Sequence, residues 1–187
     1  MKTLLRNSTT AQRTCRIGSR KRRENRNATV SEALNKIRSR VGEKNLSTSC
    51  SRDGCQVYLT DVPSNRVIVD IDKVFPDSAD EQGDYVLFYM EDKHTLITAA
   101  LELKSGDVDA SKACTQLQQA ATYAEALVKK DSNPKPVCHP ILVHGGSLHP
   151  KQRKTLNRSK VRFLGRQLTI KTARCGRPRN LALALKK

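Results

Sequence analysis

The feature that most constrains the fold is a pair of apolar segments joined by a short polar loop. Tyr85–Met90 is an unbroken apolar run, which is typical of a strand buried on both faces. Leu96–Lys104 has the composition of a second strand, and residues 91–95 between the two are polar. The two segments therefore predict a hairpin in the interior of a sheet.

Further strands and helices are expected on both sides of this hairpin. Two segments carry apolar residues at three- and four-residue spacing, which indicates amphipathic helices. The order of elements predicts a mixed α/β fold around one central sheet flanked by helices. Helices are expected over residues 29–40 and 109–130, and strands over residues 67–71, 141–143, 161–164 and 167–170.

Charge is distributed unevenly along the chain. Residues 1–40 hold 12 basic and 2 acidic residues, residues 41–150 hold 10 and 16, and residues 151–187 hold 13 and none. The net charge is +17. An excess of this size indicates a polyanionic partner, and nucleic acid is the leading candidate.

The length of 187 residues suits one domain with extensions. Residues 1–28 are polar and basic and predict a flexible arm, although a solvated tail without function fits the same composition. Residues 29–187 predict a single domain whose part from 151 to 187 is strongly basic. Contacts to phosphates, largely independent of base sequence, are expected from Arg20, Lys21, Arg22, Arg23, Lys151, Arg153, Lys154, Arg158 and Lys160.

The chain lacks the apolar run of about 20 residues that spans a bilayer, and its first residues turn polar too early for a signal peptide. We therefore expect no membrane partner, a cytoplasmic location and six cysteines that remain thiols. Cys50 and Cys55 together with Cys138-His139 could bind zinc, but their loose spacing favours free thiols.

Leu101-Glu102-Leu103-Lys104 carries the main functional signal. In a strand, Glu102 and Lys104 point to one face, while the leucines point to the other. A hairpin centred on Lys93 places Asp84 opposite Glu102, with Cβ atoms about 4.5–5.5 Å apart. Two carboxylates this close repel unless a cation lies between them, and oxygen ligands suit Mg²⁺ or Mn²⁺. The alternative is a surface Glu–Lys pair with Asp84 in a turn.

A second carboxylate pair, Asp70 and Asp72, is expected on the polar face of an edge strand. Asp72 contributes to the site only if the sheet brings it near Asp84.

The pattern of Asp84, then Glu102-Leu103-Lys104, then Gln116 on a helix resembles the PD-(D/E)XK nuclease superfamily over about residues 67–130. The resemblance implies a restriction-endonuclease-like fold, with a mixed central sheet flanked by helices. It also implies that Asp84, Glu102 and the Leu103 carbonyl bind metal, that Lys104 assists the attacking water, and that Gln116 orients the site.

Other features of the superfamily have weaker counterparts. Gln119 and Tyr123 fit the Gln-x-x-x-Tyr motif of its RecB-like branch, and Glu32 is the candidate for an acidic residue on an early helix. Gly83 is a departure, because the name of the motif has proline before the aspartate.

These observations predict a nuclease that uses Mg²⁺ or Mn²⁺ to hydrolyse phosphodiester bonds, with DNA favoured over RNA. Two alternatives stay open, namely a non-catalytic nucleic-acid-binding module and a basic subunit of a larger nucleoprotein assembly. A protein partner or a second copy of the chain is also compatible with the sequence.

Overall fold

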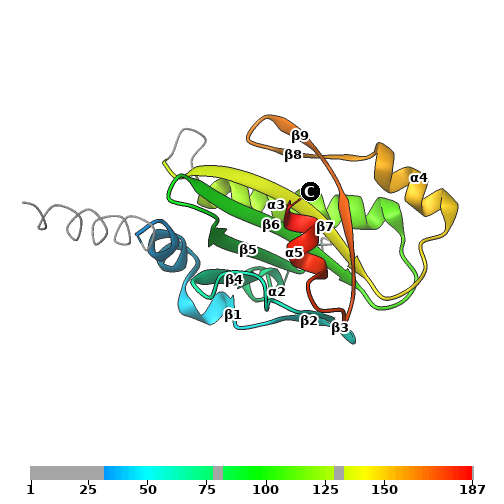
Figure 1. Cartoon of the computed structure of the whole chain (residues 1–187), viewed down its shortest axis with the longest axis horizontal. Helices are drawn as coiled ribbons and strands as arrows, with labels where there is room; N and C mark the ends of the chain where they lie inside the picture. The colour runs from blue at the N-terminus through cyan, green and yellow to red at the C-terminus, as the bar shows by residue number, and fades with distance from the viewer. Residues whose placement is uncertain (1–31, 78–81, 129–132, 187) are drawn as a thin grey trace, which may run out of the picture.

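The computed structural model describes residues 32–77, 82–128 and 133–186. A six-stranded mixed sheet runs through the centre in the order β1-β4-β5-β6-β7-β10 (Figure 1). Its strands are β1 (Leu46–Ser47), β4 (Arg66–Asp70), β5 (Tyr85–Met90), β6 (Thr95–Lys104), β7 (Lys135–His144) and β10 (Lys171–Arg174).

Helices and two short hairpins surround this sheet. The helices are residues 32–41, η1 (Glu43–Asn45), α2 (Ile71–Val74), α3 (Ala110–Leu127), α4 (Pro150–Arg158) and α5 (Asn180–Lys186). The hairpins are β2 (Cys50–Arg52) with β3 (Cys55–Val57), and β8 (Lys160–Phe163) with β9 (Arg166–Thr169).

Strand directions bring several chain segments to one end of the sheet. β1, β4, β5 and β6 are antiparallel neighbours, whereas β7 is parallel to β6 and β10 is parallel to β7. The carboxyl ends of β4, β6, β7 and β10 therefore meet the amino end of β5. We call this the polar end of the sheet, because the predicted carboxylates lie there.

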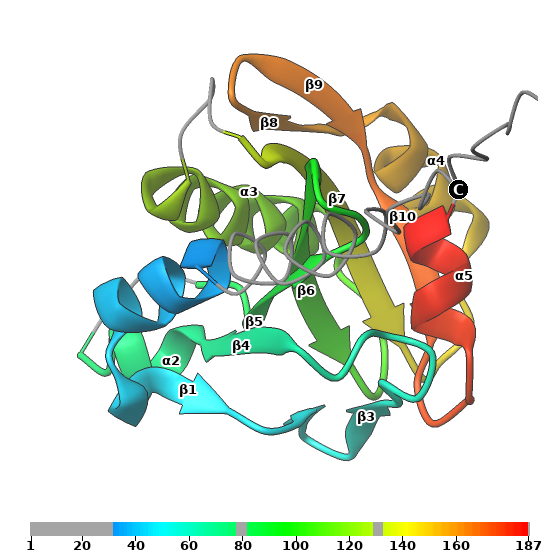
Figure 2. The ribbon, with the colours of Figure 1, turned by 60° about the vertical axis from the view of Figure 1, so that its left-hand side comes forward.

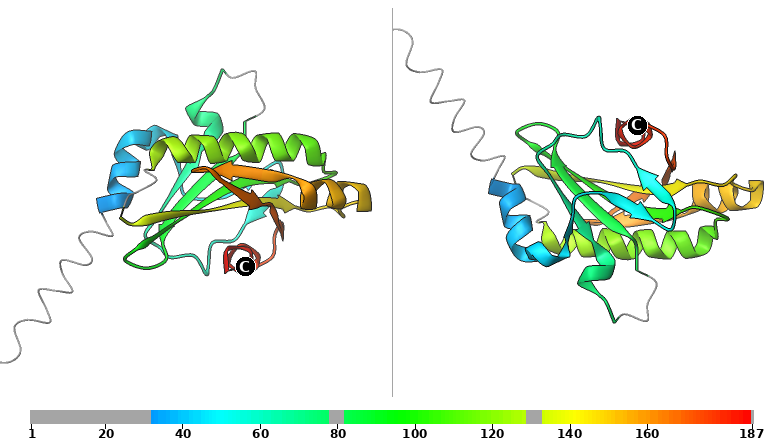
Figure 3. Two further views of the ribbon diagram at one scale, coloured as in Figure 1. Left: turned by 90° about the horizontal axis from the view of Figure 1, so that it is seen from above. Right: turned by 90° about the horizontal axis from the view of Figure 1, so that it is seen from below.

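Both faces of the sheet are covered. α3 and the helix over residues 32–41 lie on one face, and α5 lies on the other (Figure 3). The first face buries Phe88 and Leu117, and the second buries Leu87, Leu101 and Leu181. Because neither face of β5 meets water, all six of its residues are buried, as its unbroken apolar run predicted.

α3 packs unusually close to the chain that enters β5. Its small apolar residues leave room for this approach, and the Asp109 side chain caps its start by accepting from two backbone N–H groups. A Cβ atom on Gly83 would lie 2.7 Å from the Gln116 carbonyl oxygen and 2.8 Å from Ala120 Cβ. Glycine therefore occupies the position before Asp84 because α3 leaves no space for a side chain.

The prediction of a mixed α/β fold with a central sheet flanked by helices is confirmed, and β5 and β6 lie where the apolar runs placed them. The expected helix over 29–40 is observed over residues 32–41, and residues 29–31 lie outside the described residues. The expected strands 161–164 and 167–170 form the separate β8–β9 hairpin, which lies beside α3 (Figure 2). The Gln118 side chain of α3 exchanges hydrogen bonds with the backbone of Arg162 in β8. The prediction that these strands join the single sheet is wrong.

The prediction that all six cysteines are thiols is also wrong. Cys55 and Cys175 form a disulfide across 120 residues of sequence, with Cα atoms 5.2 Å apart. Cys50, Cys114 and Cys138 are free, so the zinc alternative built on Cys50, Cys55 and Cys138 has lost one of its thiols. Within the described residues, no helix is long and apolar enough to cross a membrane.

Candidate active site

The register of the β5–β6 hairpin is the one expected from a centre at Lys93. Tyr85 pairs with Leu101 and Met90 pairs with Leu96. The next step of the same register places Asp84 opposite Glu102. One Asp84 carboxylate oxygen accepts a 2.7 Å hydrogen bond from the Leu103 N–H, which holds Asp84 against the end of β6.

Glu102 is the most deeply buried acidic side chain among the described residues, with 0% of its surface exposed. Lys104 Nζ lies 2.6 Å from Glu102 Oε1, as expected for two residues on one face of a strand. Glu102 Oε2 has no well-formed hydrogen bond in the described part of the chain, although the nearby Asp84 backbone N–H favours the ionised form of this carboxyl and acts to lower its pKa. The face of β6 that carries both side chains is the face that α3 covers, so the carboxylate is buried.

Burial and charge repulsion both affect the protonation of this pair. Desolvation, followed by the charge of Asp84, raises the pKa of Glu102 to about 8, and Lys104 opposes this change. Desolvation also raises the pKa of Asp84, against the Leu103 N–H and Arg52, which favour the ionised form. Two carboxyl groups thus share one water-poor site in which a single negative charge is easier to hold than two.

Arg52, which the sequence analysis did not single out, contacts three carboxylates at the polar end. Its guanidinium lies 3.1 Å from Asp70, 2.6 Å from Asp72 and 3.3 Å from Asp84, and it stacks over the Tyr85 ring at 5.4 Å. No local pattern marks Arg52, because its partners are distant in sequence. Because Arg52 contacts both Asp72 and Asp84, these two carboxylates lie near each other. This is the condition under which Asp72 was expected to contribute to the site.

Asp70 and Asp72 were expected on one strand, but the structure places them in different elements. Asp70 ends β4, and Asp72 belongs to the short helix α2 that follows. The polar face of an edge strand is therefore the wrong description of this pair. Asp70 is buried with 8% of its surface exposed, because β4 lies between β1 and β5.

Gln116 lies beside the entrance to β5. It donates a 3.1 Å hydrogen bond to the Gln82 carbonyl oxygen, and its own Oε1 is buried without a partner among the described residues. Gln119 and Tyr123 lie one and two turns further along α3. Tyr123 packs edge to face on Phe75 at 5.6 Å, which is an apolar contact.

Glu32 lies away from this cluster. It is exposed, pairs with Lys36 at 2.7 Å, and lines a groove with Leu96 at the start of β6. Leu96 and Glu102 are about 20 Å apart along the strand at 3.3 Å per residue. The prediction that Glu32 supports the site is therefore wrong for this structure, because its helix packs on the opposite end of the sheet.

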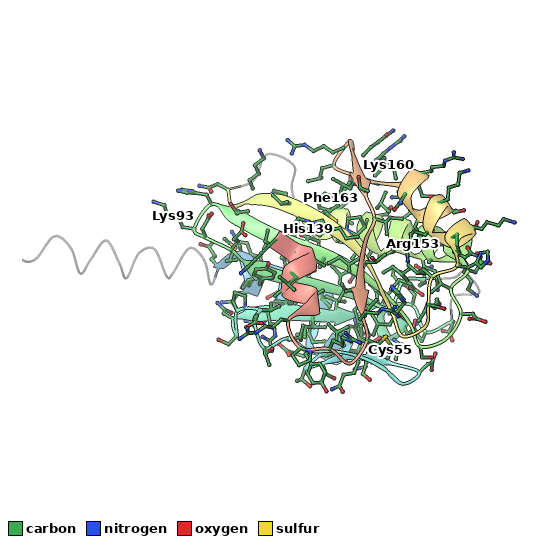
Figure 4. The ribbon with its side chains drawn as sticks, turned by 45° about the vertical axis from the view of Figure 1, so that its right-hand side comes forward. Cys55, Lys93, His139, Arg153, Lys160 and Phe163 are labelled. Carbon is green, nitrogen blue, oxygen red and sulfur yellow. A yellow bond between two sulfur atoms is a disulfide. The ribbon has the colours of Figure 1, made fainter. Side chains whose placement is uncertain are left out.

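The predicted nucleic-acid-binding residues divide into two groups. Arg20, Lys21, Arg22 and Arg23 lie outside the described residues. In the second group, Arg153 and Lys160 lie on the same side of the molecule, whereas Lys93 is at the far end (Figure 4). Lys151, Arg153, Lys154 and Arg158 are on α4, and Lys160 begins β8.

We tested whether these residues suit a divalent ion. The described residues contain no group of three or more His, Cys, Asp or Glu side chains arranged to hold a metal. Two carboxylates do converge, and the Glu102 oxygen without a well-formed hydrogen bond is an acceptor that a hard cation would satisfy. Asp84 and Glu102, with the Leu103 backbone between them, thus fit a site that leaves several ligand positions to water and phosphate.

Comparison with protein-family models, with curated protein sequences and with solved structures found no significant match to the chain.

Proposed function

We propose that this protein is a metal-dependent nuclease whose active site is the polar end of the sheet. One observation carries the proposal. Asp84 and Glu102 approach each other in a buried site with Lys104 Nζ at 2.6 Å, in a chain whose net charge is +17. Perturbed carboxylates of this kind are more frequent at functional sites than elsewhere.

The energetics of Glu102 support a functional role. A buried carboxyl without a full set of hydrogen bonds destabilises a fold, and a hydrophobic residue would pack in its place at lower cost. Here the neighbouring carboxylate increases the penalty, as the raised pKa of Glu102 shows. Binding of a cation between the two groups would remove this penalty.

The residues divide the chemistry among them. A divalent ion bound by Asp84 and Glu102 would supply positive charge that polarises a phosphate and lowers the pKa of a water. Asp84 is fixed for this role by the Leu103 N–H, and Glu102 by its rigid position in β6. Lys104 holds its ammonium beside Glu102, where it can orient the attacking water or stabilise charge on the phosphate. Gln116 positions the chain that leads into Asp84.

We further propose that the fold is restriction-endonuclease-like. The hairpin β5–β6, the parallel strand β7 and the covering helix α3 support this assignment. Gly83 in place of proline is compatible with it, because the close approach of α3 explains the glycine.

DNA is the proposed substrate in preference to RNA. The proposed location is the cytoplasm, and the Cys55–Cys175 disulfide is the observation that opposes it, because disulfides are rare in reducing compartments. A non-catalytic nucleic-acid-binding module is the second candidate. It is favoured by Arg52, whose guanidinium already lies 3.3 Å from Asp84 and supplies one of the carboxylates with positive charge.

The test is cleavage of labelled single-stranded DNA, duplex DNA and RNA with Mg²⁺, Mn²⁺ or chelator. We expect the wild type to cut DNA only with metal, and Glu102→Gln or Lys104→Ala to lose at least about a hundredfold in rate, because both groups act on the transition state. Glu91→Gln, an exposed carboxylate at the other end of the hairpin, is the matched control. Cleavage by either site variant at the wild-type rate would refute the mechanism.

A further inference from the structure

A hollow of about 640 Å³ lies between α4, β10 and α5. Among the described residues, its polar lining includes His144, Arg153, Lys171 and Arg174 and no acidic residue. We call it the basic groove. Its apolar walls come from Leu156 and from residues of α5.

The described part of the groove is rich in basic side chains. Residues 151–187 contain no acidic residue, so the segment that builds most of the groove cannot neutralise itself. Lys171 Nζ instead lies 2.9 Å from the Nδ1 of His139. Burial, with Lys171 as the second cause, lowers the pKa of His139 to about 4, so this histidine is neutral and accepts from the lysine.

The guanidinium of Arg174 is held in place by backbone carbonyl groups. Its Nη1 donates to the Gly145 carbonyl at 3.0 Å and also to the Gly146 carbonyl. His144 Nδ1 contacts the same Gly146 carbonyl at 2.7 Å. These glycines pack against the chain that follows β6. A Cβ atom on Gly145 would lie 2.4 Å from the Ser105 carbonyl oxygen, so only glycine fits there. The groove therefore has a fixed wall that touches the chain leaving the candidate active site.

The register of the sheet gives the distance from the groove to that site. Lys104 pairs with His144, and His144 pairs with Arg174. Neighbouring strands lie about 4.8 Å apart, so Arg174 is about 10 Å from Lys104 across the sheet. The Arg174 wall of the groove and the strand end that carries Lys104 are thus close enough for one nucleic-acid strand to contact both.

We propose that the basic groove binds the phosphate backbone of a nucleic-acid strand, about 10 Å across the sheet from the phosphate that lies at Asp84 and Glu102. The second half of this statement rests on the proposed nuclease function, whereas phosphate binding in the groove does not. No aromatic residue in the described part of the chain lines the groove, so contacts go to phosphates and not to stacked bases, and binding is independent of base sequence.

The test is binding of a fluorescent 20-nucleotide DNA strand, measured by anisotropy across a salt series in EDTA so that cleavage cannot interfere. The variant Arg153→Glu/Lys171→Glu alters the groove. The matched control is Lys44→Glu/Lys93→Glu, which makes the same charge change at exposed lysines of η1 and the β5–β6 loop. Each phosphate contact to a single strand contributes about 0.7 to the salt slope. We therefore expect the groove variant alone to lose about tenfold in affinity and about 1.4 in slope.

A second variant, Arg153→Ala/Lys171→Met, removes charge without adding repulsion, and thermal melting shows whether each variant is folded. The salt slope of Arg153→Ala/Lys171→Met should fall as much as that of Arg153→Glu/Lys171→Glu, and its affinity for DNA should fall less. Equal losses of DNA affinity in the groove and control variants would overturn the proposal. Displacement of the DNA by polyglutamate as readily as by polyphosphate would also overturn it. If the groove variant binds weakly but the wild type cuts nothing, the groove stands and the nuclease proposal falls.

Discussion

Replacement of Glu102 by glutamine should stabilise the metal-free protein while it removes activity. The pKa of Glu102 is raised from 4.5 to about 8, so the folded protein holds a proton that the unfolded chain releases. Its stability therefore falls as pH rises from about 4.5 to 8, and the loss is constant above that range. At about 1.36 kcal/mol for each pKa unit, the cost is about 3 kcal/mol at pH 7 and about 5 kcal/mol above pH 8.

Glutamine keeps the shape of the side chain and cannot ionise, so the variant escapes this cost. We expect Glu102→Gln in EDTA to be about 3 kcal/mol more stable than the wild type at pH 7, and to match it near pH 4. Urea unfolding at several pH values measures both quantities. The exposed Glu91→Gln variant should lie within about 0.5 kcal/mol of the wild type. A Glu102→Gln variant that is no more stable at pH 7, or whose advantage does not grow with pH, would refute the reasoning.

Three further predictions concern the surroundings of the site. Arg52→Met should lower stability by about 1–3 kcal/mol in urea unfolding, because it leaves three carboxylates without their shared cation, and Arg52→Lys should recover part of the loss. Gly83→Ala should lower the free energy of unfolding by about 1–3 kcal/mol, since the new Cβ would overlap α3. In the control Gly106→Ala the new Cβ would have no neighbouring atom within 4 Å, so stability should not change. Peptide mapping without reductant should recover the Cys55–Cys175 pair, and reductant should lower the melting temperature, because the bond closes a loop of 120 residues.

The central hairpin could be predicted because its information is local. An apolar run, a polar loop and a second apolar segment fix the strands, and a shift of one residue would move Glu102 away from Asp84 to the other face of the sheet. The opposition of Asp84 and Glu102 followed from that register alone. The Lys104 ion pair followed from the two-residue period of a strand.

What the sequence did not show depends on contacts between distant segments. Arg52 reaches three carboxylates only because the β2–β3 hairpin folds over the end of the sheet. Cys55 meets Cys175 for the same reason. α5 was missed because the alternating Leu and Ala residues of 181–185 lack a helical period, and Glu32 was misplaced because a family pattern does not say which end of the sheet a helix covers.

The most direct test of the proposed metal site is a calorimetric titration of metal-free protein with Mn²⁺ at pH 7. The proteins to compare are the wild type, Asp84→Asn, Glu102→Gln and the control Glu91→Gln. We predict that the wild type and Glu91→Gln bind Mn²⁺ with the same affinity, and that Asp84→Asn and Glu102→Gln bind it at least about tenfold more weakly. Equal Mn²⁺ affinity in all four proteins, or no binding by the wild type, would contradict a metal site at Asp84 and Glu102.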